Sequence, residues 1–318
     1  MTTPNVRIAH DSFFKQVFSR KETARSFLQE FLPAEVVACL DLETLDAMKD
    51  SFVDDELNAS FSDLCYTVRT IAGDYVVIHL LFEHKSFADP LSAFQMLKYV
   101  VRINEHRLRD GLPLCCVIPL LIYHGAERWN VPRDYQSLVN TPDATKHFLP
   151  QFAFQLYDLS QFDDNDIRGT LFLRAAMLSL KYVYRPEMAD RLSDILGLLV
   201  AIANEPVSVE CIRLVLLYIG RASPTVSVEQ LKRVVENTVE ITGKSIMPTI
   251  AETLSAEARI QGRQEGRQEG YEKGEVVGKI RLCQKFLGEA VTSKETLDNL
   301  TVIELASIFT ELEGRLSR

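Results

Sequence analysis

The feature that most constrains the fold of this 318-residue chain is a pair of strand-like segments joined by a turn. Residues 62–69 and 75–82 are rich in β-branched and aromatic residues, and Ile71-Ala-Gly-Asp74 between them has the composition of a turn. If the hairpin is centred on Gly73, the numbers of cross-strand partners sum to 146. The sequence therefore predicts an antiparallel hairpin with a defined register.

This register would bring three charged residues together. Asp63 would lie directly opposite Glu83, with side chains about 5 Å apart. Lys85 would share their face because strand side chains alternate with a period of two. Two carboxylates suit Mg²⁺, with Mn²⁺ or Ca²⁺ as alternatives, and the backbone carbonyl of His84 would add a third ligand. Lys85 would orient or help to deprotonate an attacking water. Spacing alone leaves open a solvated salt bridge at the strand end.

The next helix would add polar groups to this site. Pro90 suits the first turn of a helix that runs to about Arg109. Its apolar positions follow a helical period: Phe94, Leu97, Val101 and Leu108. Gln95 and Tyr99 lie one turn apart on the face opposite this apolar stripe, and Arg102 continues that face. An amide, a phenol and a guanidinium there could hold phosphate and position water.

The order of the elements indicates an α/β protein. A helix is expected from about Ser12 until Pro33 interrupts it, ahead of the hairpin. Residues 114–123 form a near-continuous apolar run, which is typical of a buried central strand. Pro119 within that run implies an end, a bulge or an edge, and residues 152–159 suggest a last strand. We therefore predict a mixed central sheet flanked by helices.

The remainder of the chain is expected to be all-α. Residues 167–243 hold four helical segments separated by prolines. Beyond them, glycine recurs at every fourth position from Gly262 to Gly278. Such glycines cost a helix about 4–5 kcal/mol relative to alanine, but they permit close helix approach. The stripe predicts self-association, as a dimer, with a flexible charged spacer as the alternative. Three regions are thus expected: the mixed α/β core 1–162, the helical domain 163–250 and the tail 251–318.

Composition restricts the classes of partner. The net charge of −9 argues against a dedicated nucleic-acid binder, though less against a nuclease that uses a metal and a local basic cleft. The six cysteines are scattered and are expected to be reduced thiols of a cytoplasmic protein. No signal peptide is visible, and the apolar window 195–203 is too short to cross a bilayer. We expect a soluble protein without a membrane partner.

Several motifs together resemble the Rpn (YhgA-like) recombination-promoting nucleases of the PD-(D/E)XK superfamily. They are His10-Asp-Ser-Phe-Phe-Lys15, Phe82-Glu-His-Lys-Ser86, Gln95-x-x-x-Tyr99, Pro119-Leu-Leu-Ile-Tyr-His-Gly125 and the glycine-repeat tail. The resemblance implies a PD-(D/E)XK nuclease core and a Mg²⁺-dependent DNA endonuclease that promotes recombination. It makes Asp63 and Glu83 metal ligands, Lys85 the catalytic lysine, and Gln95 and Tyr99 active-site support. The superfamily often has proline before the aspartate, whereas Ser62 stands here.

Other interpretations remain open at this point. The chain could be a non-catalytic interaction protein that keeps the nuclease fold and acts through its helical region and glycine tail. A transposase would need a third acidic residue and a helix-turn-helix module, and neither is clear in the sequence. His10 and Asp11 suit either a helix cap or a position beside the metal ligands. His124 is interpreted as a turn residue and Trp129 as a packing residue.

Overall fold

The computed structural model describes residues 4–48, 62–73, 75–83, 88–202, 208–239, 256, 274, 276–293, 296–297 and 302–316. The chain divides into two compact units, Met1–Pro248 and Thr249–Arg318. The three regions expected above, 1–162, 163–250 and 251–318, stay predictions. None of the helices in the described ranges carries an apolar stretch of the length that a bilayer requires.

The first unit is built around a five-stranded mixed sheet, which confirms the predicted α/β class. The strands follow one another in chain order: β1 (Leu40–Ala47), β2 (Ser62–Thr70), β3 (Tyr75–Glu83), β4 (Cys116–Tyr123) and β5 (Gln155–Asp158). The first three pair antiparallel and the last three pair parallel. The edge interpretation of Pro119 is confirmed, because β5 pairs with β4 only from Leu120 onward and leaves Pro119 with a neighbour on one side alone.

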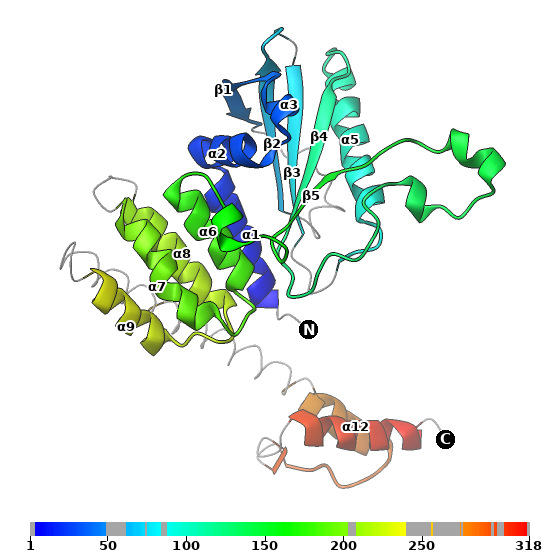
Figure 1. Cartoon of the computed structure of the whole chain (residues 1–318). Helices are drawn as coiled ribbons and strands as arrows, with labels where there is room; N and C mark the ends of the chain where they lie inside the picture. Colours follow the sequence, from blue (N-terminus) through cyan, green and yellow to red (C-terminus); the bar gives the residue numbers. More distant parts are fainter. Residues whose placement is uncertain are drawn as a thin grey trace. The chain divides into compact units, whose positions relative to one another are not determined.

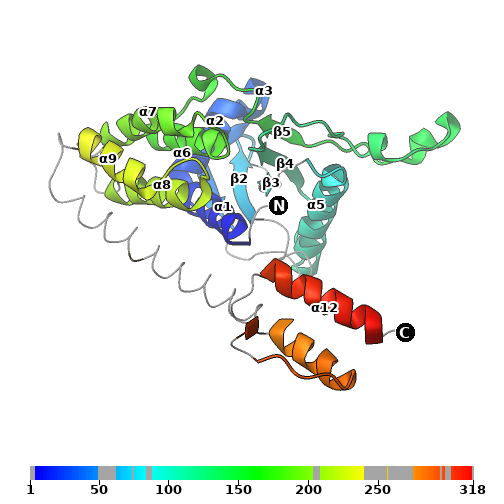
Figure 2. The ribbon, with the colours of Figure 1, turned by 90° about the horizontal axis from the view of Figure 1, so that it is seen from below.

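Helices cover the two faces of the sheet (Figures 1 and 2). On one face lie α1 (Pro4–Phe18), α2 (Lys21–Phe31) and the short α3 (Ala34–Val37). The Tyr66 hydroxyl of β2 donates to the Phe18 carbonyl, and the Tyr157 hydroxyl of β5 donates to the Phe31 carbonyl. The single helix expected from Ser12 to Pro33 is wrong in its limits: it begins at Pro4, and a break at residues 19–20 divides it into two helices.

The opposite face of the sheet is covered by α5 (Ser92–Arg109). Met96 and Tyr99 of this helix pack against Leu121 and Tyr123 of β4 in one buried cluster. The apolar stripe read from the sequence does not face this core: Phe94, Val101 and Leu108 are exposed. Tyr99, which the periodicity assigned to the polar face, lines the sheet together with Met96 and Ile103, so the orientation inferred from the stripe is wrong.

The hairpin register differs from the prediction by two residues. Arg69 pairs with Tyr75, so the pair numbers sum to 144 rather than 146. The physical reason is the turn itself. The amide of Gly73 donates to the carbonyl of Thr70 across 2.9 Å, and Gly73 has a φ of +95°. Glycine therefore closes a tight turn as its last residue instead of sitting at the midpoint, and the centre of the hairpin moves back to Ala72.

The expected helical region follows the sheet. It comprises α6 (Leu171–Tyr182), α7 (Met188–Val200), α8 (Ser208–Ala222) and α9 (Val228–Val239), after the 3₁₀ turns η1 (Gln136–Leu138), η2 (Asp143–Phe148) and η3 (Asp164–Asp166). It packs onto the start of the chain, because the rings of Phe13 in α1 and Tyr218 in α8 are stacked with centroids 3.9 Å apart. The mixed sheet and these helices thus share a core.

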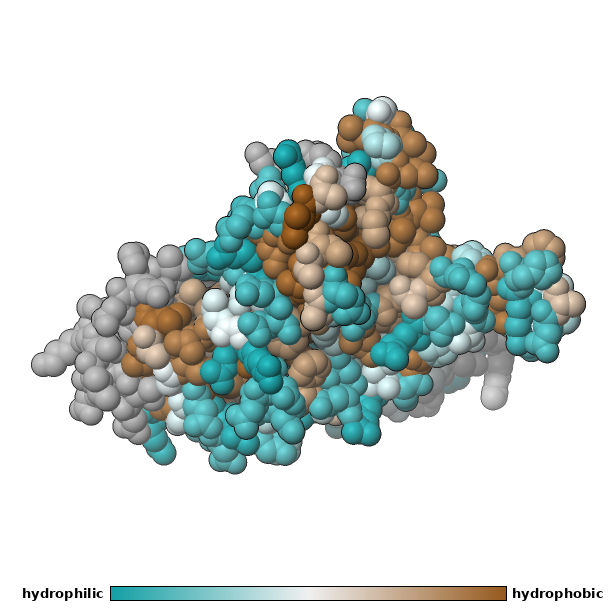
Figure 3. Space-filling view, turned by 45° about the horizontal axis from the view of Figure 1, so that its top comes forward, coloured by the Kyte–Doolittle hydropathy of each residue, from teal (hydrophilic) through white to brown (hydrophobic). Residues whose placement is uncertain are grey.

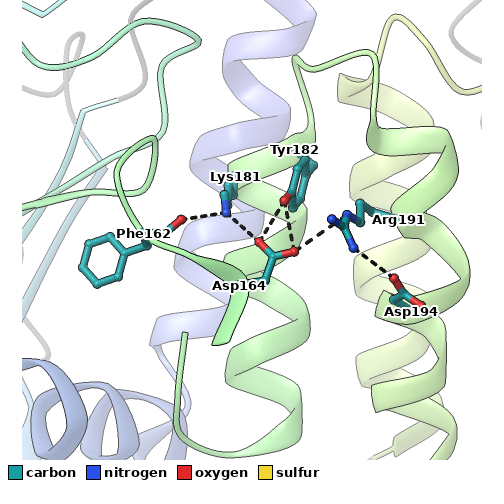
Figure 4. A network of polar contacts seen from close by, with 6 residues as sticks. All are labelled: Phe162, Asp164, Lys181, Tyr182, Arg191 and Asp194. Carbon is teal, nitrogen blue, oxygen red and sulfur yellow. Dashed lines mark hydrogen bonds and ion pairs between the residues drawn. The ribbon is translucent and has the colours of Figure 1, made fainter. Parts of the chain in front are cut away.

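A buried lysine anchors the beginning of the helical region (Figure 4). The Nζ of Lys181, only 6% exposed, donates to the Phe162 carbonyl at 2.8 Å and to Asp164 Oδ1 at 2.6 Å. The Tyr182 hydroxyl also donates to Asp164. Burial acts to raise the pKa of the Asp164 carboxyl, but these hydrogen bonds and the charges of Lys181 and Arg191 hold it below its usual value. The network fixes η3 against α6 and α7.

The second unit has a small core of its own. Its core is one cluster of buried apolar residues: Val277, Ile280, Leu297, Leu305 and Leu312. Leu305 and Leu312 belong to α12 (Val302–Leu316), which corresponds to the terminal helix of the tail. Most of the glycine stripe lies outside the described residues; Gly274 and Gly278 have open space where a Cβ would stand.

Candidate active site

The structure places the two predicted carboxylates on neighbouring strands but not opposite each other. Asp63 of β2 pairs with Leu81 of β3, and Glu83 stands two residues farther along β3. The predicted direct pairing of Asp63 with Glu83 is therefore wrong by two residues. An even shift leaves both positions on one side of the sheet, whereas a shift of one would have separated them. Diagonal neighbours of this kind lie roughly 7–8 Å apart.

The description of this corner of the molecule is limited to the backbone. The side chains of Asp63 and Glu83 lie outside the described residues, and so do His84 and Lys85 entirely. Among the side chains that are described, no three His, Cys, Asp or Glu residues gather closely enough to hold a metal ion. A metal site at this place thus depends on the residues at the ends of β2 and β3.

The sheet register joins α5 to the same side. Leu81 pairs with Leu121 and Glu83 with Tyr123, so these four positions share one side of the sheet. Leu121 and Tyr123 pack against Tyr99, which is 4% exposed. The helix face that carries Tyr99 therefore covers the side of the sheet on which positions 63 and 83 lie.

Gln95 stands one helical turn before Tyr99 and is half-buried. Its Nε2 donates to Asp89 Oδ2 at 3.2 Å, which holds the amide in place. Its Oε1 is buried and has no hydrogen-bond partner among the described residues. A buried amide oxygen without a partner is costly, so this atom can accept a hydrogen bond from a group beyond the described residues.

The end of β4 forms a tightly packed wall, which runs from Tyr123 to Gly125. Tyr123 is fully buried, and a Cβ at Gly125 would overlap its hydroxyl, so only glycine fits there. The ring of Trp129 contacts that of Tyr123 edge-on at 5.1 Å, and the indole N–H donates to the Val131 carbonyl at 2.8 Å. The predicted packing role of Trp129 is confirmed.

A buried cluster of two imidazoles and two phenols adjoins this wall. His10, with no exposed surface, contacts the Tyr218 hydroxyl through Nδ1 at 2.9 Å and the Tyr184 hydroxyl through Nε2 at 2.5 Å. The ring of His124 lies 4.9 Å from that of His10 and stacks parallel to Tyr184. A neutral imidazole has one donor and one acceptor nitrogen, so with His10 neutral one phenol donates and the other accepts.

Burial keeps both phenols protonated. It raises the pKa of Tyr184 to about 12 and raises that of Tyr218 well above its usual value. The cap interpretation of His10 and Asp11 is wrong, because both lie within α1. The turn interpretation of His124 is also wrong, since it is 2% exposed and packs into this cluster. Sequence reasoning missed Tyr184 and Tyr218, which no local pattern connects to a residue as distant as His10.

An open hollow of about 420 Å³ lies beside the cluster. Tyr184 lines it together with Arg128 and Arg185, while Glu127 and Glu187 balance their charge. Residues 126–128 of its lining directly follow the Tyr123–Gly125 wall in the sequence.

Comparison with known proteins places the chain in a recognised group. The family model described as "Putative transposase, YhgA-like" matches residues 8–209. The recombination-promoting nuclease RpnA of Escherichia coli K12 is 35% identical over 165 residues, which cover 50% of this chain and 54% of RpnA. The chain thus spans about half the length of that relative. RpnD of Escherichia coli O157:H7, of the same description, is 33% identical over 207 residues, with 63% and 77% covered.

One relative carries a different description. The inactive recombination-promoting nuclease-like protein RpnE of Escherichia coli K12 is 29% identical over 203 residues, which cover 62% of this chain and 67% of RpnE. No solved structure matches the chain. Proteins named as active and as inactive nucleases are therefore both among its relatives.

Proposed function

Since this chain belongs to the YhgA-like transposase family, we propose that it is a metal-dependent DNA endonuclease whose cuts promote recombination. The names of RpnA and RpnD support a nuclease that promotes recombination. The observation that carries the proposal is the sheet register, which keeps positions 63 and 83 on the side of the sheet that α5 covers with Tyr99.

The donor set suits a hard divalent cation. The carboxylates of Asp63 and Glu83 and the backbone carbonyl of His84 would hold Mg²⁺, and Mn²⁺ or Ca²⁺ could take its place. A cation bound there lowers the pKa of a coordinated water and offsets charge on the phosphate that is attacked. The buried Gln95 Oε1 has no hydrogen-bond partner among the described residues, and it supports such a site because it can accept a hydrogen bond from a water.

The chain's own residues would divide the remaining work. Lys85 would orient the attacking water as an ammonium or, as a neutral amine, take up its proton. Gln95, fixed by its bond to Asp89, would hold that water in line with the scissile phosphate. Arg128 and Arg185 in the neighbouring hollow would contact backbone phosphates of the strand. Glu127 and Glu187 line the same hollow, so these guanidinium groups would act as individual phosphate contacts and not through a net positive surface.

Plasmid nicking in Mg²⁺ tests the proposal. We expect Asp63→Ala and Lys85→Ala each to slow nicking by roughly 10²-fold or more, as loss of a metal ligand or proton acceptor does. Asp46→Asn is the matched control, because this exposed carboxylate lies on β1, away from the ends of β2 and β3. Undiminished cleavage by both alanine variants would remove the assigned site.

The second candidate is a non-catalytic interaction protein with a nuclease fold. The inactive description of RpnE and the acidic net charge favour it. Titration calorimetry separates the two: Mg²⁺ or Mn²⁺ binding that Glu83→Gln abolishes supports the enzyme. A wild-type chain that binds neither ion and cuts no plasmid supports the interaction protein.

A further inference from the structure

One face of α5 is apolar and exposed. Phe94, Val101 and Leu108 follow one another at intervals of seven residues, or about two helical turns, and are 43%, 48% and 56% exposed. At about 100° per residue, Tyr99 and Ile103 are turned about 160° away from Val101, and both are buried against the sheet. The helix is therefore apolar on two opposite sides, of which its own sheet covers one.

The exposed surface continues past the helix. Leu112 and Leu114, in the segment that leads into β4, are 46% and 66% exposed. Figure 3 shows apolar surface over the part of the molecule that carries α5. Contiguous exposed apolar residues of this size mark interaction surfaces far more often than scattered single ones do.

The sequence along this face is self-complementary. Measured from Val101, Phe94 lies seven residues before it and Leu108 seven residues after it, so a reversed copy of the helix places Phe94 against Leu108 of the second copy. Lys98 stands three residues before Val101, and the exposed Glu105 four residues after it on the same flank of the stripe. Reversal brings Lys98 of each copy beside Glu105 of the other.

We propose that the face of α5 that bears Phe94, Val101 and Leu108 is a self-association surface. A second copy of the chain packs its α5 antiparallel there, with a two-fold axis beside Val101. The apolar residues supply the buried centre, and the two Lys98–Glu105 pairs lie along one flank of it. A parallel pair would instead put the Lys98 and Glu105 side chains of the two copies on opposite flanks, where these pairs cannot form. The interface is separate from the glycine tail and leaves the sheet-facing side of α5, with Gln95 and Tyr99, unchanged.

Cysteine cross-linking in the full-length chain tests the contact directly. Two copies of Val101→Cys would face each other at the axis, so mild oxidation should give covalent dimers several-fold faster than in the wild type, whose six cysteines set the background. Ile71→Cys is the matched control, because Ile71 is an exposed apolar residue, 73% accessible, in the β2–β3 turn. Association through the tail alone would leave both variants at the background rate and would overturn the proposal.

Charge reversal tests the antiparallel arrangement. Lys98→Glu and Glu105→Lys should each weaken dimerisation roughly tenfold or more, because like charges then meet twice across the axis. The double variant should restore the wild-type dissociation constant, measured by sedimentation equilibrium. If a foreign protein is the true occupant, neither single variant changes self-association, and the double variant has no lost affinity to restore. That result would refute the second copy as the occupant.

Discussion

At the scale of single residues, His10 has the most demanding environment in the described structure. It has no exposed surface, and each ring nitrogen meets a phenol. The two phenols come from the helical region, so the imidazole ties the first helix of the chain to segments that follow the sheet. A cluster of this kind fixes orientation because every polar atom in it depends on the others.

We predict that Tyr218→Phe lowers the free energy of unfolding by about 1–3 kcal/mol. The change removes the hydroxyl 2.9 Å from His10 Nδ1 and leaves a buried ring nitrogen without that bond. Urea denaturation followed by circular dichroism measures the effect. Tyr135→Phe, at a half-buried position outside this cluster, should change stability little. Equal losses in the two variants would contradict a special role of the His10 contact.

The position of the carboxylates was predictable in part. Strand composition and alternation were enough to place residues 63 and 83 on neighbouring strands and on one side of the sheet. The exact pairing was not, because it depends on where in the turn Gly73 takes up its positive φ. A glycine permits such a conformation without specifying the turn position at which it occurs.

At the scale of elements, periodicity identified α5 but not its orientation. A helical repeat shows which residues share a face, and two faces of this helix are apolar enough to be buried. The face that packs on the sheet is the one with Met96, Tyr99 and Ile103. Strand β1 was missed, because Asp-Leu-Glu-Thr-Leu-Asp within it is acidic and only Leu40 and Leu45 are buried. An edge strand with so few buried residues leaves a weak signal.

The ion-pair network of η3, α6 and α7 allows a prediction about stability. Asp164→Ala leaves the buried Lys181 ammonium without its carboxylate and should cost about 3–5 kcal/mol. Asp194→Ala removes a carboxylate whose side chain is 70% exposed from the same network and should cost about 1 kcal/mol or less. Thermal unfolding compares the two, and similar losses would argue against the buried pair.

The same carboxyl makes acid stability predictable. The pKa of Asp164 is lowered in the folded protein by Lys181 and Tyr182, so its stabilisation is present above the ordinary aspartate pKa of about 3.9 and lost as pH falls through the lower folded value. Asp164→Asn should therefore be less stable at neutral pH yet lose less stability between neutral and strongly acidic pH. Urea midpoints across that range give the slope; parallel slopes for the two proteins would refute the assignment.

At the scale of the whole molecule, the chain consists of two compact units. The sheet, the helical region and the candidate site all belong to the first. No sequence pattern predicted that α8 would pack on α1, because contacts between segments so far apart depend on tertiary packing and not on local periodicity. Local periodicity also gave no sign that the sheet and the helical region share a core.

We predict that a chain ending at Pro248 folds by itself. It retains every element from α1 to α9 and should unfold cooperatively in urea, with the midpoint of the same transition in the full-length chain. Its plasmid-nicking activity should also persist, because the proposed ligands lie on the sheet. Loss of a cooperative transition would show that residues beyond Pro248 are needed for the first unit.

The contact between His10 and Tyr218 also sets an order of events during translation. The ribosome must add 208 residues after the histidine before its phenol partner exists, which takes on the order of 10–40 s at ordinary elongation rates. Until then α1 lacks the Tyr218 side chain, which contacts His10 and stacks on Phe13 in the folded protein. The packing of α1 on α8 is therefore completed only after most of the first unit has been made.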